Sequence, residues 1–158
     1  MTDDAHALSL ERVASGDLTL AELEGLTAAE AYAIADFGWM LLEQGRHPAA
    51  AAVFETLTLS NPHHAYFHAL LGSALQRWGR CEEALEAYGR ALGADPNETA
   101  ALVNRAELLI GRGSSSDIEE AALLLERAIG LDESTERPET HRARALAEAL
   151  ADRAQMAG

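Results

Sequence analysis

Small, apolar and polar positions alternate along the middle of the chain in a pattern that repeats at one fixed step. The pattern predicts two helices per unit. A glycine ends the first helix in a left-handed cap, and a proline follows the second helix. Small residues on the facing helices allow close packing, and an aromatic residue is expected to fill the gap between adjacent repeats. The recurring pairs are Gly38 and Gly72, Gly45 and Gly79, Ala50 and Ala84, Phe54 and Tyr88, and Pro62 and Pro96.

This step and this order of residue types are those of a tetratricopeptide repeat, a helix-turn-helix unit of about 34 residues. A third, less regular copy follows, in which the segment beginning at Glu119 is shifted by three extra residues. We place those residues at 114–116, where they would lengthen the inner turn, and expect Asp117 and Glu120 to cap the next helix. The predicted repeats are residues 31–64, 65–98 and 99–135.

Flanking segments complete a single domain over residues 1–158. Residues 1–27 are predicted to form a helical extension, and Thr27 with Glu30 forms a capping box that opens the first repeat. Residues 138–156 are predicted to form a capping helix over the last apolar face. The expected fold is all-α, with three tetratricopeptide repeats in a right-handed superhelix, N-terminal helices and a C-terminal cap.

In such a superhelix the first helix of each pair lines a concave groove. The groove residues predicted by repeat geometry mix aromatic, aliphatic and polar types: Tyr32, Ala35, Trp39, Leu42, Glu43, Tyr66, Ala69, Ser73, Gln76, Arg77, Ala100, Val103, Glu107 and Ile110. Arg77 and Asn104 are the candidates for holding a carboxylate there, which is too few for a carboxylate clamp. Such a surface suits an extended peptide with spaced hydrophobic anchors. For Tyr32 and Trp39 the alternative is packing beneath the N-terminal helices.

Composition narrows the possible partners. The chain has 158 residues, of which 48% are hydrophobic, and its formal net charge is -14. That charge excludes a general nucleic-acid binder, because few cations are available for phosphates. It also disfavours an anionic membrane surface, and the acidic N-terminus does not resemble a signal peptide. A cytoplasmic protein is therefore expected. The acidic faces are either solvated surface or a site for a basic partner.

Candidate catalytic chemistry is sparse. His64 and His68 share one face of a helix, but no cysteine or carboxylate at a suitable spacing completes a metal site. Cys81 stands at a helix start without an identified base. The Gly- and Ser-rich loop at residues 111–116 lacks the lysine of a phosphate-binding loop. We expect no metal, no cofactor and no enzymatic activity.

The chain resembles the class II chaperones of type III secretion, which hold translocator proteins before export. The resemblance spans residues 16–130, and its most specific part is the lead-in before the first repeat. The segments that carry it are GDLTLAELEGLT at 16–27, LEQG at 42–45, AVF at 52–54, YFHALLGSALQ at 66–76, ALEAY at 84–88 and AELLIGRG at 106–113.

The resemblance implies a peptide-binding chaperone that holds a secreted, translocator-like partner as an extended segment in the groove. It assigns cargo contacts to Ala35, Trp39, Leu42, Tyr66, Phe67 and Gln76. It also implies a homodimer through the N-terminal helices, where Leu8, Leu10 and Val13 form the apolar stripe. The alternative is a general tetratricopeptide scaffold that joins folded proteins in a complex.

Overall fold

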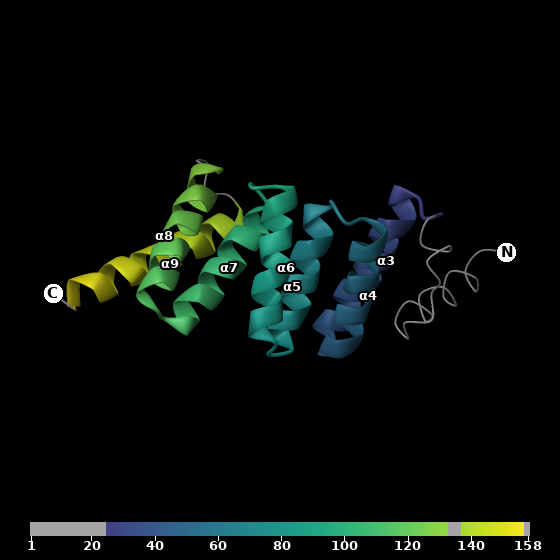
Figure 1. Ribbon diagram of the computed structural model, residues 1–158, viewed down its shortest axis with the longest axis horizontal. Helices are drawn as coiled ribbons and strands as arrows, with labels where there is room; N and C mark the ends of the chain where they lie inside the picture. Colours follow the sequence, from purple (N-terminus) through teal and green to yellow (C-terminus); the bar gives the residue numbers. More distant parts are fainter. Residues whose placement is uncertain (1–24, 133–136, 157–158) are drawn as a thin grey trace.

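The computed structural model describes residues 25–132 and 137–156, and within these ranges the chain forms seven helices and no strand. The helices follow one another in chain order along the long axis of the molecule (Figure 1). Their bounds are α3 Ala28–Glu43, α4 His47–Ser60, α5 Ala65–Arg77, α6 Cys81–Ala94, α7 Thr99–Arg112, α8 Ser115–Gly130 and α9 Pro138–Met156.

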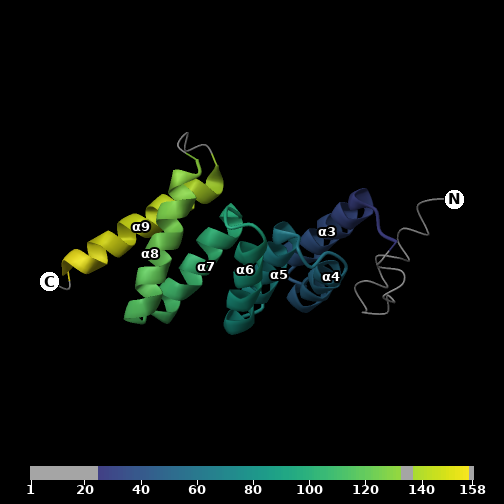
Figure 2. The ribbon, with the colours of Figure 1, turned by 45° about the horizontal axis from the view of Figure 1, so that its top comes forward.

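Each helix packs against the next in the chain, and the first helices of the pairs, α3, α5 and α7, also contact one another. The turned view shows the resulting row of helix pairs, with α9 crossing beside α7 and α8 (Figure 2). The all-α repeat fold is therefore confirmed. The extension at residues 1–24 and its apolar stripe of Leu8, Leu10 and Val13 lie outside the described residues.

The residues predicted to begin and end the helices of the first two repeats are confirmed. Thr27 and Glu30 form a reciprocal capping box at the start of α3. Gly45 and Gly79 follow the first helices with φ values of 75° and 84°. This left-handed conformation is one that glycine adopts without a steric penalty. Pro62 and Pro96 lie just beyond the last residues of α4 and α6.

The inner turn of the third repeat differs from the prediction. The Ser114 hydroxyl accepts a hydrogen bond from the Asp117 amide and caps α8, which begins at Ser115. The extra residues therefore lengthen the helix rather than the turn, and the expected cap at Asp117 and Glu120 is wrong. The Asp117 side chain instead accepts two hydrogen bonds from the Arg112 guanidinium, at 2.5 and 2.9 Å.

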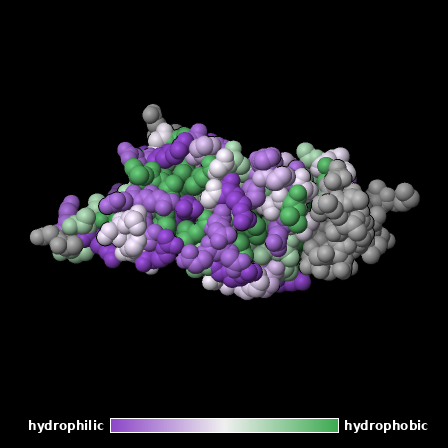
Figure 3. Space-filling view, in the orientation of Figure 1, coloured by the Kyte–Doolittle hydropathy of each residue, from purple (hydrophilic) through white to green (hydrophobic). Residues whose placement is uncertain are grey.

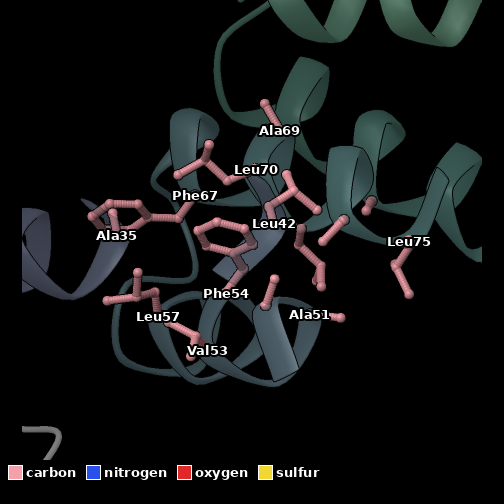
Figure 4. Packing of buried hydrophobic residues seen from close by; sticks show 14 of the residues in the cluster. Ala35, Leu42, Ala51, Val53, Phe54, Leu57, Phe67, Ala69, Leu70 and Leu75 are labelled. Atoms are coloured by element: carbon pink, nitrogen blue, oxygen red, sulfur yellow. The ribbon is translucent and has the colours of Figure 1, made fainter. Parts of the chain in front are cut away.

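The core consists of two apolar clusters, one across α3–α6 with Ala101 of α7 and one across α6–α9. In the first, Leu42, Phe54 and Phe67 point into the space shared by α3, α4 and α5 (Figure 4). A Cβ atom at Gly38 would lie 2.6 Å from the Phe54 ring. At Gly72 it would lie 2.5 Å from the Tyr88 ring. Each aromatic residue therefore packs over the glycine of its own repeat, a contact that the prediction of packing between adjacent repeats did not include.

The second cluster is covered by α9, whose Ala143 is fully buried beside the partly buried Leu146 and Leu150. Hydrophobic surface remains visible over the C-terminal helices, framed by hydrophilic residues (Figure 3). At the connection between α8 and α9, the buried Thr140 hydroxyl donates to the Asp132 carboxylate at 3.0 Å. Among the described helices, none is long and apolar enough to cross a membrane.

Candidate peptide-binding groove

A cavity of about 630 Å³ lies against the first helices of the three repeats and the start of α9. Its wall combines one indole, one phenol, small residues and charged groups. The lining residues are Asp36, Trp39, Tyr66, Ala69, Leu70, Ser73, Gln76, Arg77, Ala100, Asn104, Glu107, Glu139 and Arg142. We call this cavity the groove.

The wall that α3 contributes follows from helical spacing. Tyr32, Asp36, Trp39 and Glu43 are separated by four, three and four positions, so they share one face of the helix. That face is turned away from α4, and Trp39 remains 43% exposed. On α5, Tyr66 is 41% exposed. Neighbouring repeats therefore each offer one large, partly exposed aromatic side chain to a partner.

The structure brings together most of the predicted groove residues. Those that line the cavity are Trp39, Tyr66, Ala69, Ser73, Gln76, Arg77, Ala100, Asn104 and Glu107. Tyr32 is exposed at the start of α3 and does not line the cavity itself, and neither do Glu43 and Ile110.

Four predicted groove residues are instead part of the core. Ala35, Leu42, Phe67 and Val103 are between 0% and 2% exposed, so their placement on the groove wall is wrong. Successive residues of an α-helix are about 100° apart around its axis, and a position next to the groove stripe therefore turns toward the neighbouring helices. Ala35 and Leu42 follow the buried spacing of Ala31 and Gly38, which faces α4.

Sequence reasoning missed four lining residues, Asp36, Leu70, Glu139 and Arg142. Asp36 and Leu70 had a detectable signal, because each lies one helical turn from a predicted groove residue. Glu139 and Arg142 belong to α9, which lies outside the repeat period. No spacing within the repeats indicates where α9 crosses the groove.

A hydrogen-bonded network fixes the C-terminal part of the groove. The Tyr88 hydroxyl donates to the Gln76 side chain at 2.7 Å, and Gln76 donates to Glu107 at 3.0 Å. Burial raises the pKa of Tyr88 to about 12, so the phenol is a neutral donor at physiological pH. Gln76 is thereby held with its amide group toward Glu107.

Arg142 extends this network from α9. Its guanidinium donates to the Asn104 side-chain oxygen at 2.6 Å and to the Glu107 carboxylate at 2.7 Å. Asn104 in turn donates to the Ser73 hydroxyl at 3.3 Å. Side chains from α5, α7 and α9 are therefore joined across the groove floor.

The other groove arginine is also engaged. Arg77 pairs with Glu43 at 3.0 Å and lies over the Trp39 ring, with 5.5 Å between the guanidinium carbon and the ring centroid. This cation–π contact orients the indole at the rim. Both arginines that line the groove are thus already neutralised by carboxylates.

Aromatic rings gather beside the groove at the starts of α3 and α5. The His64 ring stacks on Phe67 with centroids 4.1 Å apart, and Tyr32 approaches both rings edge-on. His64 Nε2 lies 3.2 Å from the Tyr32 hydroxyl, whereas His68 Nε2 lies 2.8 Å from the Pro62 carbonyl oxygen. The two histidines therefore contact different protein groups and do not converge on one point.

Metal-ligating and nucleophilic side chains are the remaining candidates within the described residues. No group of three or more histidine, cysteine or acidic side chains is placed there to hold a metal ion. Cys81 is the exposed first residue of α6.

Comparisons with known proteins place the chain among helical repeat proteins. The family model described as "Bacterial transcriptional activator domain" matches residues 6–100, and a tetratricopeptide repeat model matches residues 70–134. No curated protein sequence matches the chain significantly.

Solved structures of secretion chaperones share the fold. PcrH from Pseudomonas aeruginosa is 26% identical, with a TM-score of 0.71, and the match covers 84% of this chain and 99% of PcrH. PcrH in complex with the chaperone binding region of PopD matches with 25% identity and a TM-score of 0.70, covering 82% and 96% of the two chains.

The translocator chaperone SycD of Yersinia enterocolitica, 21% identical, matches with a TM-score of 0.71 over 82% of this chain and 97% of SycD, in a structure described as an alternative dimer. The fold is thus that of type III secretion translocator chaperones. The repeats are tetratricopeptide repeats, and by the match over more than half of its length the chain belongs to the bacterial transcriptional activator domain family.

Proposed function

We propose that the protein is a peptide-binding chaperone that holds an extended segment of a secreted, translocator-like protein in the groove. The observation that carries this proposal is the pair of half-exposed aromatic side chains, Trp39 and Tyr66, at one cavity formed by three repeats. The likeness to PcrH, solved with the chaperone binding regions of PopD and PopB, supports the same use of the fold.

The mechanism is burial of apolar anchors without a catalytic step. An extended segment presents side chains at regular intervals, and the groove offers Trp39, Tyr66 and the floor of Ala69 and Leu70 to receive them. Covering these anchors withholds them from aggregation and from premature assembly. This role needs neither metal nor nucleotide, and we place it in the cytoplasm.

The groove assignment is tested by replacing, in separate variants, two tryptophans of similar exposure. Trp39 and Trp78 are 43% and 41% exposed, but Trp78 lies on the other face, over a cavity between α4 and α6. Partners are captured from the native lysate with wild type, Trp39→Ala combined with Tyr66→Ala, and Trp78→Ala, after circular dichroism has shown that each variant is folded. We expect one dominant partner, lost at least tenfold in the groove variant and retained by Trp78→Ala.

The partner's own behaviour is the second measurement. A chaperone cargo is insoluble when produced alone and soluble when produced with this protein. Equal capture by the wild type and the groove variant would contradict the assignment.

The alternative is a general tetratricopeptide scaffold that joins folded proteins in a complex, and the tetratricopeptide repeat match over residues 70–134 is compatible with it. Partners of a scaffold are soluble alone. They would also remain bound to the groove variant if they contact the convex helices α4 and α6. The same capture experiment therefore separates the two functions.

A further inference from the structure

The groove has an excess of unpaired negative charge. Of its charged lining residues, Arg77 pairs with Glu43 and Arg142 pairs with Glu107. Asp36 and Glu139 also line the groove, and neither has an ion pair within the described part of the chain. The cations are thus neutralised by neighbours while two carboxylates remain available.

These carboxylates line the same cavity as one exposed aromatic side chain, Tyr66. Burial raises the pKa of Tyr66, and the charges of Asp36 and Glu98 raise it further. Glu98, half-buried before the first residue of α7, has its own pKa raised by burial and by the nearby Asp95 and Glu139. Asp36 and Glu98 are therefore close enough to act on Tyr66, and Glu139 of α9 lines the same cavity near Glu98.

Resting on the proposed function, we propose that the segment bound in the groove carries a lysine or arginine next to an apolar anchor, with its cation at Tyr66 between Asp36 and Glu139. The apolar anchor packs toward Trp39 and Leu70. The cation is attracted by the face of the phenol ring and by the carboxylates.

The charge arrangement also disfavours an acidic segment as the partner. An acidic segment would meet Asp36 and Glu139 without a free arginine to offset the repulsion, since separating Arg77 or Arg142 from its carboxylate costs an existing ion pair. The net charge of -14 for the whole chain acts in the same direction by attracting basic segments from a distance.

A random ten-residue peptide display library tests the preference without knowledge of the natural cargo. The full-length protein is used for selection, and peptides that also bind the variant Trp39→Ala with Tyr66→Ala are discarded. We expect the remaining sequences to be enriched in lysine or arginine next to apolar residues, and depleted in aspartate and glutamate.

Charge variants then locate the preference. The variant Asp36→Asn with Glu139→Gln removes two groove carboxylates, whereas Glu55→Gln with Asp152→Asn removes two exposed acids elsewhere. For a selected peptide and its lysine-to-glutamine counterpart, anisotropy titration should give a three- to tenfold difference in affinity with wild type. This difference in affinity should persist in the control, Glu55→Gln with Asp152→Asn. It should disappear in Asp36→Asn with Glu139→Gln, and also in about 0.5 M salt, which screens exposed charges.

The possible failures are distinguishable. Groove-dependent peptides without a basic preference, or a preference unchanged by Asp36→Asn with Glu139→Gln, would overturn this inference and leave the groove function standing. If no selected peptide depends on Trp39 and Tyr66, the groove function is wrong and this inference falls with it.

Discussion

At the scale of single residues, the contacts between glycine and aromatic residues explain why small residues recur at the repeat period. A Cβ atom on Gly72 would lie 2.5 Å from the Tyr88 ring and one on Gly38 would lie 2.6 Å from Phe54. These distances are far inside van der Waals contact, and both rings are fully buried. Neither ring can move aside without opening the core.

Gly72→Ala should therefore destabilise the protein, although alanine is the better helix former. We expect a loss of about 1–3 kcal/mol in the free energy of unfolding, as for other overpacked cores. The control is Gly93→Ala in α6, where a Cβ atom meets nothing within 4 Å. Urea unfolding followed by circular dichroism measures both variants, and equal stability of the two would contradict the packing argument.

At the scale of the helix, the start of α8 differs from the one that the local sequence predicted. Ser114, rather than Asp117, caps the helix, and the Asp117 carboxylate is then free to pair with Arg112 at the end of α7. Arg112 also reaches Glu82 on α6 at 3.2 Å. Asp117 therefore takes part in a contact among α6, α7 and α8 instead of capping α8. The sequence of α8 alone did not indicate this, because the guanidinium comes from a neighbouring helix.

This contact predicts a pH dependence of stability. The hydrogen bonds from Arg112, and next those of Ser114, hold the pKa of Asp117 well below its usual range. Its carboxylate therefore stabilises the fold above the unfolded-state pKa of about 3.9, and the contribution is lost as the pH falls toward the lower folded value. Asp117→Asn should melt below wild type at pH 7, and the gap should narrow by pH 2.

Thermal unfolding at both pH values checks this expectation. Asp152→Asn, an exposed acid on α9, serves as the control and should show no such gap. A gap for Asp117→Asn that is the same at pH 7 and pH 2 would show that its carboxylate charge does not contribute.

At the scale of the whole molecule, the C-terminal end has a core cluster of its own, distinct from the cluster of the first repeats. The second cluster depends on α9, which supplies the buried Ala143 and the partly buried Leu146 and Leu150. The same helix brings Glu139 and Arg142 to the groove. Stability at this end and the charge of the groove are therefore linked through one helix.

Removal of residues 138–158 should lower the free energy of unfolding by about 3–5 kcal/mol, from the apolar side chains it uncovers. The loss should concentrate in α7 and α8, since α3–α6 have their own cluster. Hydrogen exchange would locate it. The control is the point variant Met156→Ala, at a position that is 83% exposed. A substitution at such a surface position should change stability by less than about 0.5 kcal/mol.

The sequence by itself determined the repeat period, the helix-ending glycines and prolines, and the small residues on the facing helices. These features depend on neighbours within one repeat, and local spacing encodes them. Only the tertiary structure decided which neighbouring positions face the groove, since Ala35 is buried and Asp36 exposed although they are adjacent. It also decided the groove charge, because Arg142 and Glu139 come from a helix outside the period, and their place depends on how α9 packs on α7 and α8.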